Sequence, residues 1–325
     1  MLISEITSEQ LVSGQFLITE NQLRVAKNGN SYLALKLSDG TGELPAKVWD
    51  ASEELFHSLA VGKVIMVNGL RPRIYQSQIQ LDWDSKNNEV YQIVADDLVD
   101  FMLFLPKAPG KVEDYWNRLQ LIMKGIKEPF LQKVLTIFFE DQKFVTDFLR
   151  YPAALKRHHN YLGGLVEHTT GVTTICQAIS VYYQPLNVDL LLTGAILHDI
   201  GKTKTYQLNA GFEGTNEGKL IGHLVLGISM VERACEQVIL EIGLTEENTF
   251  LRNSLLHLLV SHHGIMEWGS PIEPLTLEAC LLHHADNLDA QATKFLTVIR
   301  SQPKGTEWAA YDNGLGRSLY LGSLG

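Results

Sequence analysis

Histidine is unevenly distributed along this sequence of 325 residues. Ten of the 11 histidines fall between positions 158 and 284, and only His57 lies outside that stretch. Neutral imidazole binds divalent metal ions and also serves as an acid or base near neutral pH. A lone histidine on an apolar helix face is more often a packed core residue, so only histidines that share a face with other polar groups indicate a site.

One such group lies at the end of a predicted helix. The helix expected over residues 189–202 carries His198 on the same apolar face as Leu191, and Asp199 sits beside it, about 100° further round. Gly201 is expected to end this helix, as glycine commonly does. The imidazole and the carboxylate should therefore project together from the core side of the helix.

A second helix, expected over residues 252–264, repeats this design. Leu255, Leu258 and Leu259 lead along the helix to His262, and His263 continues the adjoining apolar stripe. Gly264 is expected to cap the helix. Two imidazoles therefore point inward together.

A third helix, expected over residues 278–290, places Asp286 on a face that should be buried. An unpaired buried carboxylate would be costly. A metal cluster satisfies inward-facing imidazole and carboxylate groups from several helices, and Mn²⁺, Fe²⁺ and Zn²⁺ all accept such ligands. The lack of paired cysteines disfavours a structural zinc site. The residues themselves therefore predict a metal site.

Two kinds of element must position these residues. Residues 15–93 alternate with a period near two around frequent turn signals, with a helical insert at about 50–59, which predicts a small β-barrel over residues 1–95. Pro106, Pro109 and Gly110 mark a connector over residues 96–112. Helical spacing then dominates from 113 to 325, so we expect a multidomain protein with an all-β barrel followed by an all-α domain.

Composition limits the function classes. The formal net charge of -10 argues against a broad basic surface for nucleic acid, so any such contact must be local. Cys176, Cys235 and Cys280 are far apart and have apolar neighbours, which favours buried free thiols in a reducing compartment. The sequence shows neither a basic-then-apolar signal peptide nor a run of roughly 18 apolar residues, so we expect a cytoplasmic protein without membrane contact.

Five motifs carry a resemblance to a known family. They centre on His168, on His198-Asp199, on His223, on His262-His263 and on Asp286. Their order resembles the H…HD…H…HH…D signature of the HD-domain metal-dependent phosphohydrolases, over roughly residues 150 to 290. The resemblance implies two divalent ions that share Asp199, which is a hydrolytic geometry. By that resemblance one ion would bind His168, His198, Asp199 and Asp286, and the other would bind Asp199, His223, His262 and His263.

The predicted barrel ahead of this domain narrows the resemblance. The chain is similar to the YhaM-type bacterial 3′-5′ exoribonucleases, whose N-terminal module is an OB-fold. The motifs that carry this likeness are Asn28-Gly29-Asn30, Asp39-Gly40-Thr41-Gly42, Lys47-Val48-Trp49, His158-His159-Asn160-Tyr161 and the stretch from Glu217 to His223. The resemblance implies two divalent metal ions, with Mn²⁺ favoured and Fe²⁺, Co²⁺, Zn²⁺ or Mg²⁺ as alternatives. It also implies single-stranded RNA, or single-stranded DNA, as substrate. Whether the chain forms a homo-oligomer stays open.

Asp199 and Lys202 are the predicted catalytic residues. Asp199 would bridge the ions, and Lys202, one residue past Gly201, could reach a phosphate oxygen or the leaving group as a cation. The alternative for Lys202 is a cation that answers the dipole at a helix C-terminus.

The barrel offers stacking faces and cations for a single strand, a combination that OB-folds use without reading the base sequence. The candidate nucleic-acid contacts are Tyr32, Lys47, Trp49, Arg71, Arg73 and Tyr75, with His159 added from the helical domain. The alternative for the aromatic residues is packing in the barrel core, and for His159 it is a surface or supporting position near the ligands.

Three functions fit the sequence. The leading hypothesis is a 3′-5′ exoribonuclease that releases nucleoside monophosphates through a metal-activated water. The second is a phosphodiesterase or phosphatase that acts on small nucleotides, with a regulatory barrel. The third is a nucleic-acid-binding protein without catalysis.

Overall fold

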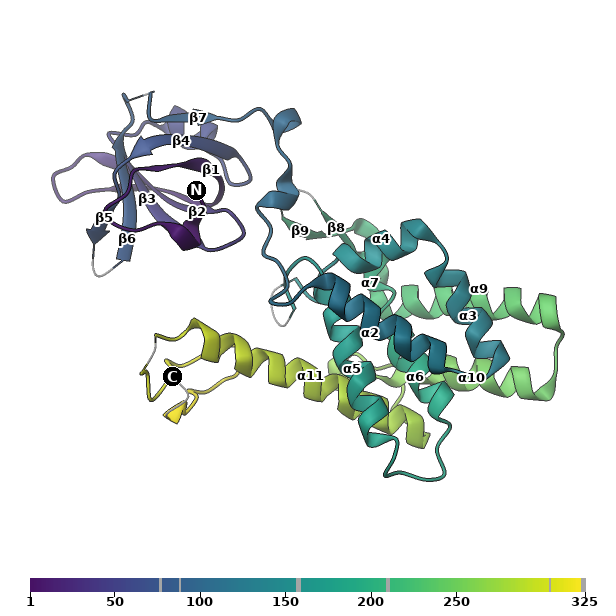
Figure 1. The fold of residues 1–325 in the computed structure, drawn as a ribbon. Coiled ribbons are helices and arrows are strands. Elements are labelled where there is room, and N and C mark those ends of the chain that lie inside the picture. Colours follow the sequence, from purple (N-terminus) through teal and green to yellow (C-terminus); the bar gives the residue numbers. More distant parts are fainter. Residues whose placement is uncertain (76–77, 88, 156–158, 209–210, 304, 323–325) are drawn as a thin grey trace. The chain divides into compact units, whose positions relative to one another are not determined.

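The structure is a computed structural model that describes residues 1–75, 78–87, 89–155, 159–208, 211–303 and 305–322. The chain forms two compact units (Figure 1). Unit 1 comprises Met1–Lys107 and Leu208–Phe212, and unit 2 comprises Ala108–Gln207 and Glu213–Gly325. The first passage between the units thus falls inside the segment expected to be a connector.

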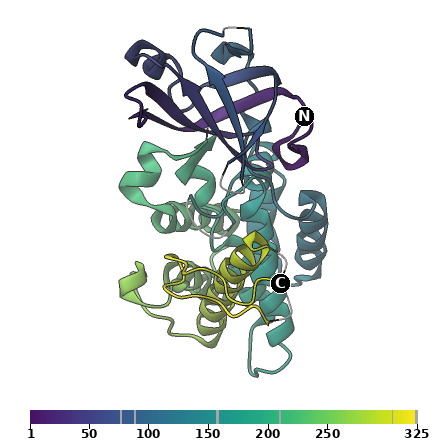
Figure 2. The same ribbon diagram turned by 90° about the vertical axis from the view of Figure 1, so that its left-hand side faces the viewer.

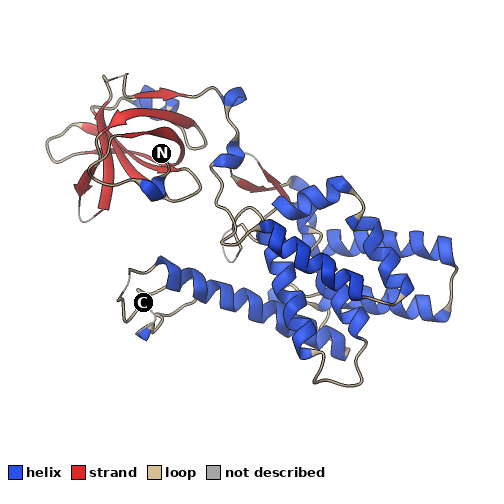
Figure 3. Ribbon diagram, in the orientation of Figure 1, coloured by secondary structure: helices blue, strands red, loops and turns tan. Residues whose placement is uncertain are grey.

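Unit 1 is a mixed β-sheet with one short α-helix (Figure 3). Its strands are β1 (Val12–Val25), β2 (Ser31–Ser38), β3 (Glu43–Trp49), β4 (Val64–Leu70), β5 (Arg73–Tyr75), β6 (Gln78–Asp84) and β7 (Tyr91–Ile93), and its helix is α1 (Glu53–Ser58). The order across the sheet is β5-β6-β3-β2-β1-β4-β7, and the one parallel pair in this order is β3 with β6. Because β4 also contacts β6, the sheet curls on itself. The predicted N-terminal OB-type fold is confirmed.

The long strand β1 makes this curl possible. It pairs with β4 from Val12 to Leu17 and with β2 from Leu17 to Val25, and its register shifts within each pairing. Each such irregularity bends a strand and increases its twist. On β2, Leu33, Leu35 and Leu37 are buried and alternate with more exposed residues, which is the period-two pattern read from the sequence.

The turn between β2 and β3 packs against the segment around Leu105. The Asp39 carboxylate accepts hydrogen bonds from the backbone N–H groups of Thr41 (2.9 Å) and Ile3 (2.5 Å), which fixes the turn between β2 and β3. Gly40 has φ +81°, and a Cβ there would lie 2.6 Å from the Leu105 carbonyl oxygen. The turn therefore needs glycine both for its left-handed backbone and for the close approach of the segment around Leu105.

Unit 2 is mainly helical and contains part of one small hairpin, whose segment Leu208–Phe212 belongs to unit 1. Its helices are α2 (Val112–Gly125), α3 (Pro129–Phe139), α4 (Gln142–Arg150), α5 (Gly164–Ile179), α6 (Val188–Leu197), α7 (Lys202–Thr205), α8 (Asn216–Ile221), α9 (His223–Ile242), α10 (Glu246–Ser261) and α11 (Leu277–Ser301). The expectation of an all-α domain holds except for strands β8 (Tyr206–Leu208) and β9 (Phe212–Gly214), where partly buried and exposed residues alternate. Among the described residues, no helix is long and apolar enough to span a bilayer.

Helix α6 forms the centre of unit 2. Every residue from Leu190 to Leu197 is buried, and α6 contacts α5, α10 and α11. Gly194 allows α10 to approach closely, because a Cβ at this position would lie 2.3 Å from a methyl carbon of Leu258. The residues that follow Leu197 therefore emerge from the middle of the helical core.

Helix α11 is the longest helix of unit 2, with 25 residues. The chain after α11 folds back along its C-terminal part (Figures 1 and 2). Ala309, Leu319 and Leu321 are buried there against partly buried residues of α11 such as Phe295 and Val298. This small cluster is separate from the main core of unit 2.

Candidate metal centre

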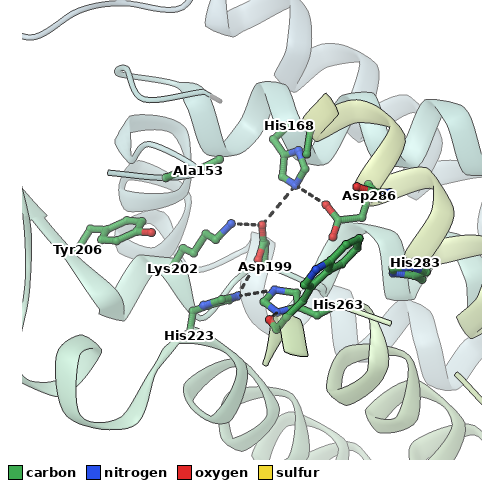
Figure 4. Close-up of a pocket in the computed structure, with 13 residues that line it drawn as sticks. Ala153, His168, Asp199, Lys202, Tyr206, His223, His263, His283 and Asp286 are labelled. Atoms are coloured by element: carbon green, nitrogen blue, oxygen red, sulfur yellow. Dashed lines mark hydrogen bonds and ion pairs between the residues drawn. The ribbon is translucent and has the colours of Figure 1, made fainter. Parts of the chain in front are cut away.

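The seven predicted metal ligands converge in unit 2 from five elements. His168 lies on α5, His198 and Asp199 follow α6, His223 begins α9, His262 and His263 follow α10, and Asp286 lies on α11. Figure 4 shows His168, Asp199, His223, His263 and Asp286 around one pocket. The local reasons for this convergence are found at the helix ends.

Helix α6 ends earlier than the sequence indicated. It stops at Leu197, and His198 keeps helical backbone angles as the C-cap residue. Gly201 does not act as a left-handed cap, because its φ is -58° and it precedes the short helix α7. Its lack of a side chain serves a different need, since a Cβ would lie 2.0 Å from the backbone oxygen of His223. Gly201 therefore brings the start of α9 close to Asp199.

Gly264 ends the α10 region as the sequence predicted, with φ +82°. A Cβ on Gly264 would lie 2.2 Å from the ring of His283. The Nδ1–H of His283 donates to the carbonyl oxygen of His262 at 2.8 Å. The glycine thus serves both the turn and the placement of a ring that supports the backbone of His262.

Hydrogen bonds fix the orientation of four ligand rings through their Nδ1 atoms. These bonds run from His198 to the Ala195 carbonyl (2.8 Å), from His262 to the Leu259 carbonyl (2.7 Å), from His263 to the Trp268 carbonyl (2.9 Å) and from His168 to Oδ2 of Asp289 (2.7 Å). A carbonyl or carboxylate oxygen only accepts, so Nδ1 carries the hydrogen and a neutral ring presents the Nε2 lone pair to the interior. Outer partners of this kind orient histidines that bind metals.

The inward nitrogens face one another in pairs. Nε2 of His168 lies 3.3 Å from Nε2 of His198, and Nε2 of His223 lies 3.3 Å from Nε2 of His263. With the Nδ1 atoms of His168 and His198 already donating, two neutral rings would oppose lone pair to lone pair. A cation between them, either a proton or a metal ion, removes this repulsion, so the donor set fits a metal ion.

Asp199 stands between the two pairs. Its Oδ2 lies 3.4 Å from Nε2 of His168 and of His198, and its Oδ1 lies 3.5 Å from Nε2 of His223 and 3.8 Å from Nε2 of His262. The residue is 2% exposed, and Oδ1 has no hydrogen-bond partner among the described residues. A buried carboxylate oxygen without a donor is costly. Donor atoms of the predicted ligands lie within 4.8 Å of one another in three groups of three residues: His168 with His198 and Asp286, His223 with His262 and His263, and His198 with Asp199 and His262, which joins the other two.

The pKa shifts of the cluster histidines differ between its two sides. Burial disfavours the charged form of His168, yet Asp199, Asp286 and Asp289 raise its pKa well above the usual value. On the other side, burial lowers the pKa of His223 to about 3, and burial with the nearby His198 and His263 lowers that of His262 well below its usual range. His223 and His262 are therefore neutral near pH 7, which is the form that binds metal.

Lys202 lies beside the Asp199 carboxylate. Its ammonium group donates to Oδ2 of Asp199, and the side chain lines the pocket (Figure 4). Burial alone would lower the pKa of Lys202, but the negative charge of Asp199 raises it. Lys202 is the first residue of α7, and because this helix has four residues it also belongs to the last turn, so both predicted roles of Lys202 stay predictions.

The pocket has a volume of about 360 Å³ and a mixed lining. Besides predicted metal ligands, Lys202 and His283, it is lined by Tyr206, Trp268, Asn287 and the small side chains of Ala153, Ala154 and Ala290. These residues were not predicted as site residues. Their types carry no metal-binding signal, and only the fold brings them beside the ligands.

Asp286 and Asp289 take different places around His168. Oδ1 of Asp286 lies 3.2 Å from the inward Nε2, whereas Oδ2 of Asp289 holds the outward Nδ1. Asp289 also binds Nε2 of His159 at 2.9 Å. Gly171 makes room for this carboxylate, because a Cβ there would lie 2.2 Å from its Oδ1. Asp286 thus faces the inward nitrogen of His168 together with the other predicted ligands, and Asp289 holds its outward nitrogen.

His159, predicted to contact nucleic acid, is 3% exposed. In addition to Asp289 it contacts the Tyr161 hydroxyl at 3.0 Å and Oε2 of Glu167 at 3.5 Å. Its position is therefore the supporting one that the sequence left open. His158, which precedes it, lies outside the described residues.

Four of the six barrel candidates gather on one face of unit 1. The Lys47 ammonium lies 5.7 Å from the ring centre of Tyr32, 5.5 Å from that of Trp49 and 4.5 Å from that of Tyr75. Tyr75 is 53% exposed, and the Tyr32 and Trp49 side chains are partly buried. We call these four residues the barrel patch. The remaining candidates, Arg71 and Arg73, have exposed side chains between β4 and the start of β5.

A match to a protein-family model agrees with this geometry. Residues 165–291 match the family model described as HD domain, a group of metal-dependent phosphohydrolases. The solution NMR structure of the OB domain of Ta0387 from Thermoplasma acidophilum is similar at 13% identity, covering 30% of this chain and 88% of that chain, with a TM-score of 0.24. The helical unit thus contains an HD domain with a His/Asp cluster that can hold metal, which is consistent with a hydrolase.

Proposed function

We propose that this protein is a 3′-5′ exoribonuclease that uses two divalent metal ions, preferably Mn²⁺, to hydrolyse single-stranded RNA to nucleoside monophosphates. The observation that carries the proposal is the position of the Asp199 carboxylate. One of its oxygens faces His168 and His198, and the other faces His223 and His262. A carboxylate in this position suits a bridge between two ions.

Bound ions would polarise the phosphate oxygens and lower the pKa of a bound water, which supplies the nucleophile. His168, His198 and Asp286 would hold one ion, and His223, His262 and His263 the other. The chain itself adds Lys202, whose ammonium is held in the pocket by Asp199. It can shift to a phosphate oxygen and offset charge in the transition state.

The barrel patch supports a single-stranded nucleic acid as substrate. Three aromatic rings around one ammonium offer stacking surfaces and a local positive charge in a chain whose net charge is -10. Stacking of this kind is independent of the base sequence. It suits an enzyme that moves along a strand, and it accepts DNA as well as RNA.

The decisive experiment incubates the purified protein and Mn²⁺ with a 5′-labelled single-stranded RNA. We expect progressive shortening from the 3′ end and release of nucleoside monophosphates. Asp199→Asn keeps the size of the side chain but removes its charge, and it should abolish this activity. A wild-type protein that leaves the RNA intact, or that cuts it internally, would overturn the proposal.

The pocket itself favours a second candidate, a phosphodiesterase or phosphatase for small nucleotides. At about 360 Å³ it is a small space in which catalytic groups and apolar walls lie together. Trp49→Ala separates the candidates, because it should weaken RNA turnover and leave the turnover of a dinucleotide unchanged. An exclusive activity on small nucleotides in the wild type would favour this second function.

A further inference from the structure

The pocket carries an aromatic side chain that the proposed chemistry does not use. Trp268 is the last residue of a 3-10 helix, Met266–Trp268, and it lines the pocket together with Lys202 and His263. It is 53% exposed. A half-exposed indole that lines this pocket offers a surface on which a planar ring can stack.

The backbone of this residue is tied to the metal centre. The carbonyl oxygen of Trp268 accepts the Nδ1–H of His263 at 2.9 Å. The turn then closes at Gly269, whose φ is +87°, and at Ser270, which is 3% exposed and donates to the Val260 and Ile272 carbonyls at 3.2 and 2.8 Å. The position of Trp268 is therefore set by the same contacts that orient a ligand.

The indole is also supported from within the protein. The ring of His283 packs against it, with ring centres 6.0 Å apart and planes inclined by 45°. His283 is in turn held by the carbonyl oxygen of His262 and lies in the space left by Gly264. An aromatic ring held on a fixed support loses little freedom when it binds a ligand.

The rest of the pocket has the lining that a nucleotide requires. The cationic Lys202 and the metal ligands form a region suited to phosphate. Ala153, Ala154 and Ala290 leave space, and Asn287 contributes an amide that can pair with a base or a ribose.

We propose that Trp268 stacks on the nucleobase of the 3′-terminal nucleotide and so positions that nucleotide for hydrolysis. This inference rests on the proposed function, and it adds a specificity residue outside the metal ligands. Stacking does not read base identity, so the residue should favour a terminal nucleotide with any base over one without a base.

The test compares two RNA strands that differ only at the 3′ end, one with adenosine and one with a stable abasic residue. For the wild type we expect the abasic end to raise KM by about 5- to 150-fold, the range of one lost base–aromatic stack. Trp268→Ala should raise KM for the adenosine end and abolish the difference between the two strands. Trp268→Phe should restore most of it. A difference that persists in Trp268→Ala would overturn the inference.

Phe250→Ala is the matched control, because Phe250 is a 62% exposed aromatic residue near the start of α10, about three turns before His262. It should keep the wild-type ratio between the strands. A binding assay separates this inference from the proposed function. Adenosine 5′-monophosphate added with Mn²⁺ should quench the tryptophan fluorescence of the wild type more than that of Trp268→Phe. If RNA is not hydrolysed, the proposed function fails while this quenching still supports the stack. Equal quenching in both proteins would overturn the stack.

Discussion

Replacing Asp289 with asparagine should weaken metal binding without dismantling the site. Oδ2 of Asp289 accepts the Nδ1–H of His168 at 2.7 Å and contacts Nε2 of His159 at 2.9 Å. Burial opposes ionisation of this carboxyl, but hydrogen bonds from His159 and His168 hold its pKa well below the usual value. It is therefore charged near pH 7, and its charge makes the ring of His168 a stronger ligand for a metal ion.

The size of the effect follows from what asparagine keeps. The amide oxygen can still accept from His168 in the place of Oδ2, and the amide nitrogen takes the place of Oδ1 beside Gly171, so ring orientation should survive while the negative charge is lost. Loss of an outer partner of this type costs about 10- to 100-fold in metal affinity or activity. We expect Asp289→Asn at the lower end of this range and Asp289→Ala at the upper end.

Metal affinity is measured by competition with a fluorescent chelator, and kcat/KM is measured on RNA at saturating Mn²⁺. Asp189→Asn is the matched control, because this carboxylate accepts the backbone N–H groups of Lys127 and Glu128 at 2.8 Å, away from the site. It should lower the melting temperature and leave metal affinity unchanged. Wild-type metal affinity in Asp289→Asn would refute the orienting role.

Three further changes test the fold, the charge state and the barrel. Gly201→Ala should destabilise the protein by about 1–3 kcal/mol or more in urea unfolding, because the new Cβ would overlap backbone atoms of His223. Gly125→Ala is the control and should not destabilise, because its Cβ would have no neighbour within 4 Å. Equal urea midpoints for the two variants would contradict this. Burial lowers the pKa of His223 to about 3 in the folded protein, so the unfolded chain takes up a proton on this residue at a higher pH than the folded chain does. The metal-free protein should therefore lose stability as pH falls from about 6.5 towards 3. His223→Gln should make that decline shallower in urea midpoints measured with chelator present, and identical declines would count against it. Lys47→Gln should weaken single-stranded RNA binding and reduce the slope of log K against log salt by about 0.7; an unchanged slope would exclude a phosphate contact.

Much of the fold could be predicted because periodicity is local. The alternation of Leu33, Leu35 and Leu37 predicted a strand, and helical spacing through Leu255, Leu258 and Leu259 predicted α10. The end of α6 was misplaced because Gly201 was read as a cap. Its true constraint is the start of α9 packed against it, which local sequence does not show.

The residues of the candidate site could likewise be predicted from spacing only where the evidence for them is local in the sequence. His198 with Asp199 and His262 with His263 follow buried helices, so their faces could be inferred from spacing. His168 and His223 came from a family resemblance, since nothing in their own segments marks them. Trp268 and the orienting role of Asp289 depend on contacts between distant segments, which no pattern within one segment reveals.

The most direct test of the two-ion centre is the number of metal ions bound per chain after Mn²⁺ loading and desalting, measured by elemental analysis. We predict two ions for the wild type, one each for Asp286→Ala and His263→Ala, and close to none for Asp199→Ala, because Asp199 faces both sets of donors. A single ion in the wild type, or two ions in Asp199→Ala, would contradict the two-ion centre bridged by Asp199.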